Sequence, residues 1–229
     1  MQGSDPTRIP RLISALQDAW EGQPDLSLPA FIGMLQTKGL SWGSTEEELL
    51  MLLDEVSSRH PALITAAPAS PTVIATSSPR MTVTLSGGTV IARSGDDPRR
   101  MPGLWRYSGL RPAGPGRPLV ITDEEGTEHR MGVVELMTVI DAARAPGTAF
   151  LEQTEVGSAR WLILFEDGSR AVLGQRLRMW TTAGRETELE IIPWRAVAVV
   201  PGGEMEVAPA GGGKTRRLGP VAAVWLLEV

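Results

Sequence analysis

The sequence contains no cysteine among its 229 residues. This absence excludes disulfide bonds, thiolate metal sites, iron–sulfur clusters and cysteine nucleophiles. Lysine is also scarce, with two residues against twenty arginines, and such a bias is typical of a GC-rich bacterial genome. Folding must therefore rest on the burial of apolar side chains. The 42% hydrophobic and 21% charged residues are close to the averages of globular proteins.

Recognisable catalytic sets are lacking as well. His60 and His129 are the two histidines, and neither has neighbours at the spacing of a metal site. No serine stands in the Gly-x-Ser-x-Gly pattern of a nucleophile elbow. We therefore expect no catalytic residue, no metal and no cofactor. A hydrolase or transferase whose site is assembled in space stays open as an alternative.

Long hydrophobic runs are missing too. The longest apolar stretches, such as 221–227, have the length of a strand, far below the roughly 20 residues that span a bilayer. Residues 1–11 are polar and do not resemble a signal peptide. We expect a cytoplasmic protein without a membrane partner.

Residues 1–64 show the apolar spacing of α-helices. Apolar side chains recur three and four residues apart, which places them on one stripe of a helix. They are Ile9, Leu12, Ile13, Leu16 and Trp20. Pro10 suits the first turn of this helix, where it loses no hydrogen bond, and the pattern stops at residues 22–24.

Start signals predict two further helices. Ser27 can cap one of them, with Pro29 in its first turn. Its predicted buried residues are Leu28, Phe31, Ile32 and Leu35. Ser44 and Glu47 have the spacing of a capping box at the start of the other. Its predicted buried residues are Leu49, Leu50, Leu52, Leu53 and Val56.

Residues 9–56 resemble a known family. The residues that carry the resemblance are Leu16, Trp20, Pro24, Asp25, Leu26, Leu28, Phe31 and Leu35. Their order is similar to the Trp, Pro-Asp-Leu, Leu, Phe, Leu progression of the short helical YihD-type family of bacterial proteins. The resemblance implies a helical fold for this segment. Because that family is functionally uncharacterised, the resemblance implies no catalytic residue.

Three short helices also allow a helix-turn-helix interpretation, in which the third helix enters the major groove of DNA. The charge argues against it, because residues 1–64 carry four basic and nine acidic side chains. The segment that would meet the DNA, residues 44–58, is itself acidic, whereas phosphate binding requires positive charge. The sequence favours a helical interaction or packing module.

The pattern changes after residue 64. Residues 65–79 are rich in Ala, Pro, Ser and Thr, which is typical of a semi-flexible linker. Beyond them the apolar period falls to two, and glycine-bearing turns recur at short intervals. We therefore predict an α+β chain in which a small three-helix domain precedes a mostly antiparallel β domain over 80–229. That domain would form a sandwich or one or two small barrels, the latter over 80–142 and 148–229.

The strands are predicted from alternating apolar residues between turn signals. The predicted ranges are 81–85, 89–92, 119–122, 128–134 (extending to 139), 150–156, 161–165, 171–173, 177–181, 188–192, 196–200, 205–207 and 221–227. Four tryptophans fall in these strands, and we expect them to be core residues. They are Trp161, Trp180, Trp194 and Trp225.

Two motifs have simple structural interpretations. Residues 211–215 (Gly-Gly-Gly-Lys-Thr) resemble part of a phosphate-binding loop, but Ala208 stands where its first glycine belongs and a strand-like run follows. We predict a hairpin loop there. The carboxylates of residues 96–97 and 123–125 could hold a hard cation, but their positions in predicted turns favour bonds to their own backbone.

The segment 93–118 is the candidate binding site. It holds six arginines against two aspartates, with two aromatic residues between them. Single-stranded nucleic acid binds such surfaces, because bases stack on rings and guanidinium groups meet phosphates. The alternative is a core tryptophan with arginines that solvate a loop. The candidate residues are Arg99, Arg100, Trp105, Arg106, Tyr107 and Arg111.

The sequence therefore favours a non-catalytic protein-interaction or regulatory adaptor, with protein as its partner. A β-barrel that binds single-stranded nucleic acid is the first alternative.

Overall fold

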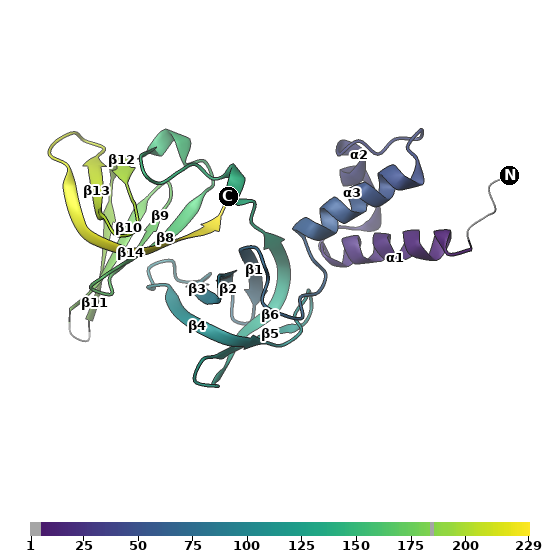
Figure 1. Ribbon diagram of the computed structural model, residues 1–229, viewed down its shortest axis with the longest axis horizontal. Helices are drawn as coiled ribbons and strands as arrows, with labels where there is room; N and C mark the ends of the chain where they lie inside the picture. Colours follow the sequence, from purple (N-terminus) through teal and green to yellow (C-terminus); the bar gives the residue numbers. More distant parts are fainter. Residues whose placement is uncertain (1–5, 184–185) are drawn as a thin grey trace. The chain divides into compact units, whose positions relative to one another are not determined.

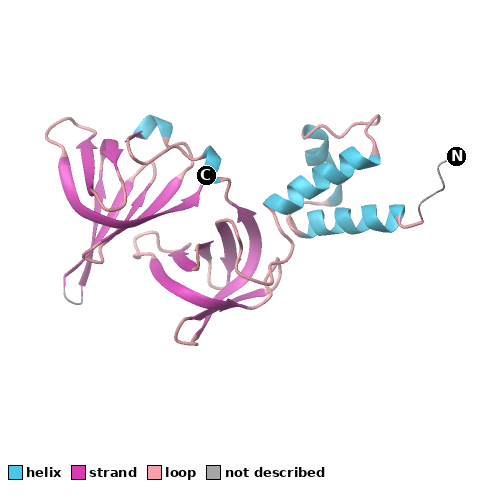
Figure 2. Cartoon of the chain, in the orientation of Figure 1, coloured by secondary structure: helices cyan, strands magenta, loops and turns pink. Residues whose placement is uncertain are grey.

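The computed structural model describes residues 6–183 and 186–229. The chain has the predicted α+β architecture: three helices come first, and the rest is built mainly from antiparallel strands (Figures 1 and 2). Its contacts fall into two units. The first unit contains Met1–Val90 and Trp105–Val139, and the second contains Ile91–Leu104 and Ile140–Val229. The helices and most of the first barrel thus share one unit.

The helical part consists of α1 (Arg8–Glu21), α2 (Leu28–Thr37) and α3 (Glu46–Arg59) (Figure 1). Its core holds five fully or nearly fully buried residues: Ala19, Phe31, Leu35, Leu53 and Val56. Each large apolar side chain removed from water in this way contributes about 1.5–3 kcal/mol to stability.

The predicted stripe of α1 is only partly buried. Trp20 packs against the helical core and donates its indole N–H to the Leu26 carbonyl at 2.7 Å. Ile9 and Ile13, near the other end of the helix, are 65% and 53% exposed. Helical spacing identified the stripe, but only its second half packs into the helical core, whereas the start of α1 meets α3 through the ion pair between Arg8 and Glu46.

The helix starts agree with the predicted caps to within one residue. Ser27 caps α2 and accepts a hydrogen bond from the Ala30 amide. The capping box of α3 is formed by Thr45 and Glu48, not by Ser44 and Glu47. The correction has a local cause, because the Ser44 hydroxyl accepts from the Ser41 amide instead.

The first β structure is a closed barrel of six strands. Its strands are β1 (Thr72–Ser77), β2 (Met81–Ser86), β3 (Thr89–Ser94), β4 (Gly103–Leu110), β5 (Pro118–Asp123) and β6 (Glu128–Val139). The barrel closes because β1 pairs antiparallel with both β2 and β6. Its interior is filled by alternate strand residues, among them Ile74, Val83, Leu85, Ile121 and Met137.

Two of these strands were not predicted. β1 lies within residues 65–79, so the linker is shorter than predicted. Its strand pattern is flanked by prolines at 68, 71 and 79, which favour a linker interpretation. β4 lies within the glycine- and proline-rich arginine segment. A hydrogen bond also joins the helical part to the barrel, because His60 Nδ1 lies 3.1 Å from the Met137 carbonyl oxygen on β6.

The second β structure is a single antiparallel sheet of eight strands. Its strands are β7 (Leu151–Glu152), β8 (Arg160–Phe165), β9 (Arg170–Leu173), β10 (Leu177–Ala183), β11 (Glu186–Ile192), β12 (Trp194–Ala198), β13 (Glu204–Pro209) and β14 (Arg216–Glu228). Two short 3₁₀ helices, Ala142–Arg144 and Gln153–Glu155, accompany them (Figure 2). The predicted strand over 150–156 is thus reduced to two residues, because a helical turn follows them.

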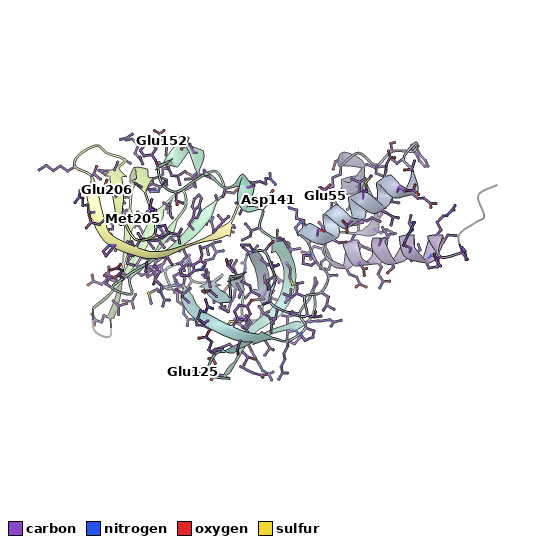
Figure 3. All side chains as sticks on the ribbon, in the orientation of Figure 1. Glu55, Glu125, Asp141, Glu152, Met205 and Glu206 are labelled. Atoms are coloured by element: carbon purple, nitrogen blue, oxygen red, sulfur yellow. The ribbon has the colours of Figure 1, made fainter. Side chains whose placement is uncertain are left out.

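The long strand β14 joins the two halves of this sheet. Its first part pairs with β13 and its second part with β8. Residues from both halves share one core, including Trp161, Trp194 and Met205 (Met205 is labelled in Figure 3). Alternate residues of β8, β9 and β10 face the other side, where residues of the segment 91–104 cover Leu162, Val172 and Trp180. Three of the four predicted core tryptophans are at least 96% buried, and Trp225 is partly buried.

No helix of the described residues has the length and apolar character needed to cross a membrane.

Candidate binding surfaces

The structure divides the predicted arginine and aromatic site. Arg99 and Arg100 belong to the second unit, whereas Trp105, Arg106, Tyr107 and Arg111 belong to the first. Within the second unit, Arg99 and Arg100 are exposed. The Arg99 carbonyl accepts a hydrogen bond from the Trp180 indole at 2.7 Å. That backbone contact anchors the segment and leaves the Arg99 side chain at the surface.

The two aromatic residues of this segment pack against other residues of the barrel. Tyr107 is 8% exposed, and burial raises the pKa of its phenol. The Trp105 ring lies against the His129 ring, with 5.2 Å between the ring centroids, and the Trp105 indole nitrogen is buried. Neither ring is a free stacking platform for a base.

His129 in turn is held by Asp123. The His129 Nε2 atom lies 2.8 Å from Asp123 Oδ2, and Asp123 Oδ1 accepts the amides of Glu125 and Thr127. The bond to His129 and then these amides lower the pKa of the Asp123 carboxyl. Asp97 accepts the Arg99 amide in a similar turn. These contacts confirm the turn role predicted for both carboxylate groups (Glu125 is labelled in Figure 3).

The arginines of β4 and its following loop carry counter-charges. Arg106 Nε lies 3.5 Å from Glu124, and Arg111 donates twice to Glu128, at 2.6 and 3.0 Å. Within the segment itself the carboxylates are Asp96 and Asp97, but β-pairing brings others from β6 and from the turn between β5 and β6. The predicted positive excess is therefore largely offset in the first unit.

The glycine-rich stretch 211–215 and His60 have structural roles, as their sequence contexts predicted. Residues 211–215 form the connection between β13 and β14, which are antiparallel neighbours. His60 is half-buried between α3 and β6, and its ring lies 3.2 Å from the Thr138 hydroxyl. Burial lowers the pKa of His60.

The helical part has a candidate binding surface that no motif in the sequence indicated. A pocket of about 470 Å³ opens between the α2–α3 loop and α3, and its volume falls within the range of ligand sites. We call it the helical pocket. Its lining residues are Lys38, Gly39, Ser41, Gly43, Ser44, Glu48, Met51, Leu52 and Glu55.

Trp42 projects from the loop that forms one wall of the helical pocket. Its exposure is 104%, so its whole indole is in water, and Met51 on α3 is 65% exposed. The loop that carries Trp42 is held in place, because Ser41 and Ser44 are hydrogen-bonded to each other and to the loop backbone. The sequence signal was the stretch Ser-Trp-Gly-Ser, whose small polar residues cannot cover an indole.

The helical pocket is acidic on the α3 side. Glu55 projects from α3 (Figure 3) and pairs with Lys38, whose ammonium lowers the pKa of the Glu55 carboxyl. Glu48 lies on the same helix and accepts the Thr45 amide through one oxygen. A ligand in the pocket therefore meets two carboxylates and one ammonium group beside the exposed side chain of Met51.

No family model, no curated protein and no solved structure matches this chain.

Proposed function

We propose that this protein is a non-catalytic adaptor that binds a partner protein through its helical part. The single observation that carries the proposal is the fully exposed Trp42, whose chain neighbours Ser41 and Gly43 line the helical pocket. Tryptophan is rarely left in water and is enriched among the residues that dominate protein interfaces. An exposed indole on an ordered loop is an anchor that costs little conformational entropy to bind.

The charge of the helical part selects the partner chemistry. Residues 1–64 hold nine acidic and four basic side chains, and the pocket lining carries two carboxylates, Glu48 and Glu55, against the single lysine Lys38. A basic segment with apolar side chains complements this surface, since opposite charges steer association and suppress wrong partners. We therefore assign the helical pocket to a basic, apolar-containing peptide segment of another protein.

Selection from a displayed library of random peptides tests this assignment. The full chain is immobilised, and bound peptides are sequenced and compared with those bound by the Trp42→Ala variant. The proposal expects enrichment of Arg or Lys beside Leu, Phe or Trp on the wild-type chain alone. Enrichment of acidic peptides, or equal enrichment on both chains, would contradict it.

A further inference from the structure

The second unit contains a pocket that differs from every site described above. Its volume is about 220 Å³, and it lies over β8, the end of β9 and the start of β10. We call it the arginine pocket. Its lining residues are Arg160, Val172, Gly174, Gln175, Arg176 and Arg178.

Strand pairing explains why these arginines meet. Val172 pairs with Leu162 on β8 and with Arg178 on β10. Alternation along β8 places Arg160 on the same face as Leu162, and Arg176 lies in the turn before β10. Gly174 leaves room for this arrangement, because a Cβ there would stand 3.2 Å from Arg160 Cγ.

One carboxylate balances this group. Arg160 Nη1 and Arg93 Nη1 donate to the same oxygen, Glu228 Oε1, at 2.8 and 2.9 Å. Within the described ranges 6–183 and 186–229, Arg176 and Arg178 form no ion pair. Three guanidinium groups therefore line the pocket, and only that of Arg160 is paired, with a carboxylate that it shares with Arg93.

The positive charge around the pocket is only partly compensated. The Nε and Nη2 atoms of Arg93 are buried without a hydrogen-bond partner in the described structure. Burial first, and then the charges of Arg160 and Arg176, lower the pKa of Arg178. Like charges held together in this way cost free energy, and a bound anion would offset that cost.

We propose that the arginine pocket binds a phosphoryl group, either inorganic phosphate or the phosphate of a small monoester. Guanidinium groups match phosphate oxygens with paired donors. A phosphate dianion fits the surplus of positive charge better than a single carboxylate does. The pocket volume is below the range of about 300–1,000 Å³ for drug-sized ligands, so it accommodates the anionic group and leaves the rest of an ester outside.

Calorimetric titration of the full chain at low ionic strength tests the proposal. The probes are inorganic phosphate, adenosine monophosphate and acetate. We expect both phosphates to bind with a dissociation constant of about 1 mM or lower and acetate at least about tenfold more weakly. Preference for the monophosphate over inorganic phosphate would identify an ester as the source, and equal binding would identify free phosphate.

Three variants localise the binding. Arg176→Gln and Arg178→Gln should each weaken phosphate binding about tenfold. Arg195→Gln is the matched control, because Arg195 is exposed on β12 of the same sheet and is not part of the pocket. Arg176 is exposed, so its replacement is expected to leave the fold unchanged, and circular dichroism checks each variant.

Three outcomes would overturn the proposal. The first is no phosphate binding to the wild-type chain at about 10 mM ligand. The second is equal weakening by Arg195→Gln, which would show that general surface charge is responsible. The third is binding of single-stranded RNA through Arg176 and Arg178 without any binding of the small phosphates, which would assign the arginines to a polymer backbone.

Discussion

The helical pocket and the arginine pocket differ in the source of their charge and in what they leave exposed. In the helical pocket, Glu55 is paired with Lys38, and the unsatisfied feature is the exposed indole of Trp42 on the adjoining loop. In the arginine pocket the apolar face is covered by residues 91–104, and the unsatisfied feature is the charge of Arg176 and Arg178. The first surface is therefore suited to a partner with apolar side chains, and the second to a small anion.

The largest expected effect comes from replacing one side chain, which should change ligand binding at the helical pocket alone. Trp42→Ala should weaken binding of a selected basic peptide about thirtyfold or more, since truncation of a central interface tryptophan costs about 2 kcal/mol or more. Phosphate binding should stay unchanged. Calorimetry with both ligands measures the contrast. The variant Gln17→Ala, at an exposed position of α1, is the control, and its failure to bind the peptide would contradict the assigned location.

Salt should act unequally on the two ligands. Raising the ionic strength from about 20 mM to about 200 mM should weaken phosphate binding about tenfold, because screening acts directly on a bond made of charges alone. Peptide binding should weaken less, since burial of Trp42 contributes much of its free energy. Titrations at four salt concentrations measure both slopes, and equal slopes would remove the distinction.

A smaller effect is expected from the shape of the arginine pocket. Gly174→Ala should weaken phosphate binding about threefold, because the new methyl group displaces the Arg160 side chain by a few tenths of an ångström. Gly211→Ala is the matched control, since a Cβ there meets no atom within 4 Å. Equal affinity of the Gly174→Ala and wild-type chains would show that the position of Arg160 is unimportant.

The smallest effect is a pH dependence confined to the first unit. Burial lowers the pKa of His60, so as the pH falls the His60 ring takes up a proton in the unfolded chain at a higher pH than it does in the folded chain. This part of the stability is complete above about pH 6.5 and decreases as the pH falls below that value. Both histidines of the chain lie in the first unit.

Amide hydrogen exchange measures that dependence. Protection in β6, beside His60, should fall between about pH 7 and pH 5 relative to protection in β8, after correction for intrinsic rates. His60→Asn removes the titrating ring and should abolish the difference. An equal loss of protection in β8 would contradict the assignment of this pH dependence to His60.

Local patterns predicted most of the fold. Helix spacing, caps and glycine-bearing turns gave all three helices and most hairpins, because these signals act within a few residues. β1 was hidden by the prolines around it, and β4 by its arginines and glycines. The resemblance of residues 9–56 to the YihD-type family stays a prediction.

The binding surfaces were less predictable, because charge balance is set by residues far apart in the sequence. Arg106 and Arg111 formed a conspicuous basic segment, yet strand pairing supplied Glu124 and Glu128. Arg160 and Arg178 stand among apolar residues in separate strands, and nothing in their local sequence indicates that they meet. Trp42 was visible in the sequence, but its exposure depends on how α2 and α3 place their loop.

Photocrosslinking from position 42 in living cells tests the adaptor function most directly. A photoreactive amino acid replaces Trp42 in one strain and Gln17 in another, and crosslinked products are identified by mass spectrometry. We predict a discrete protein adduct from position 42, attached at a basic segment that contains apolar residues, and none of this kind from position 17. The same adducts from both positions, or no protein adduct from position 42, would contradict the proposed function.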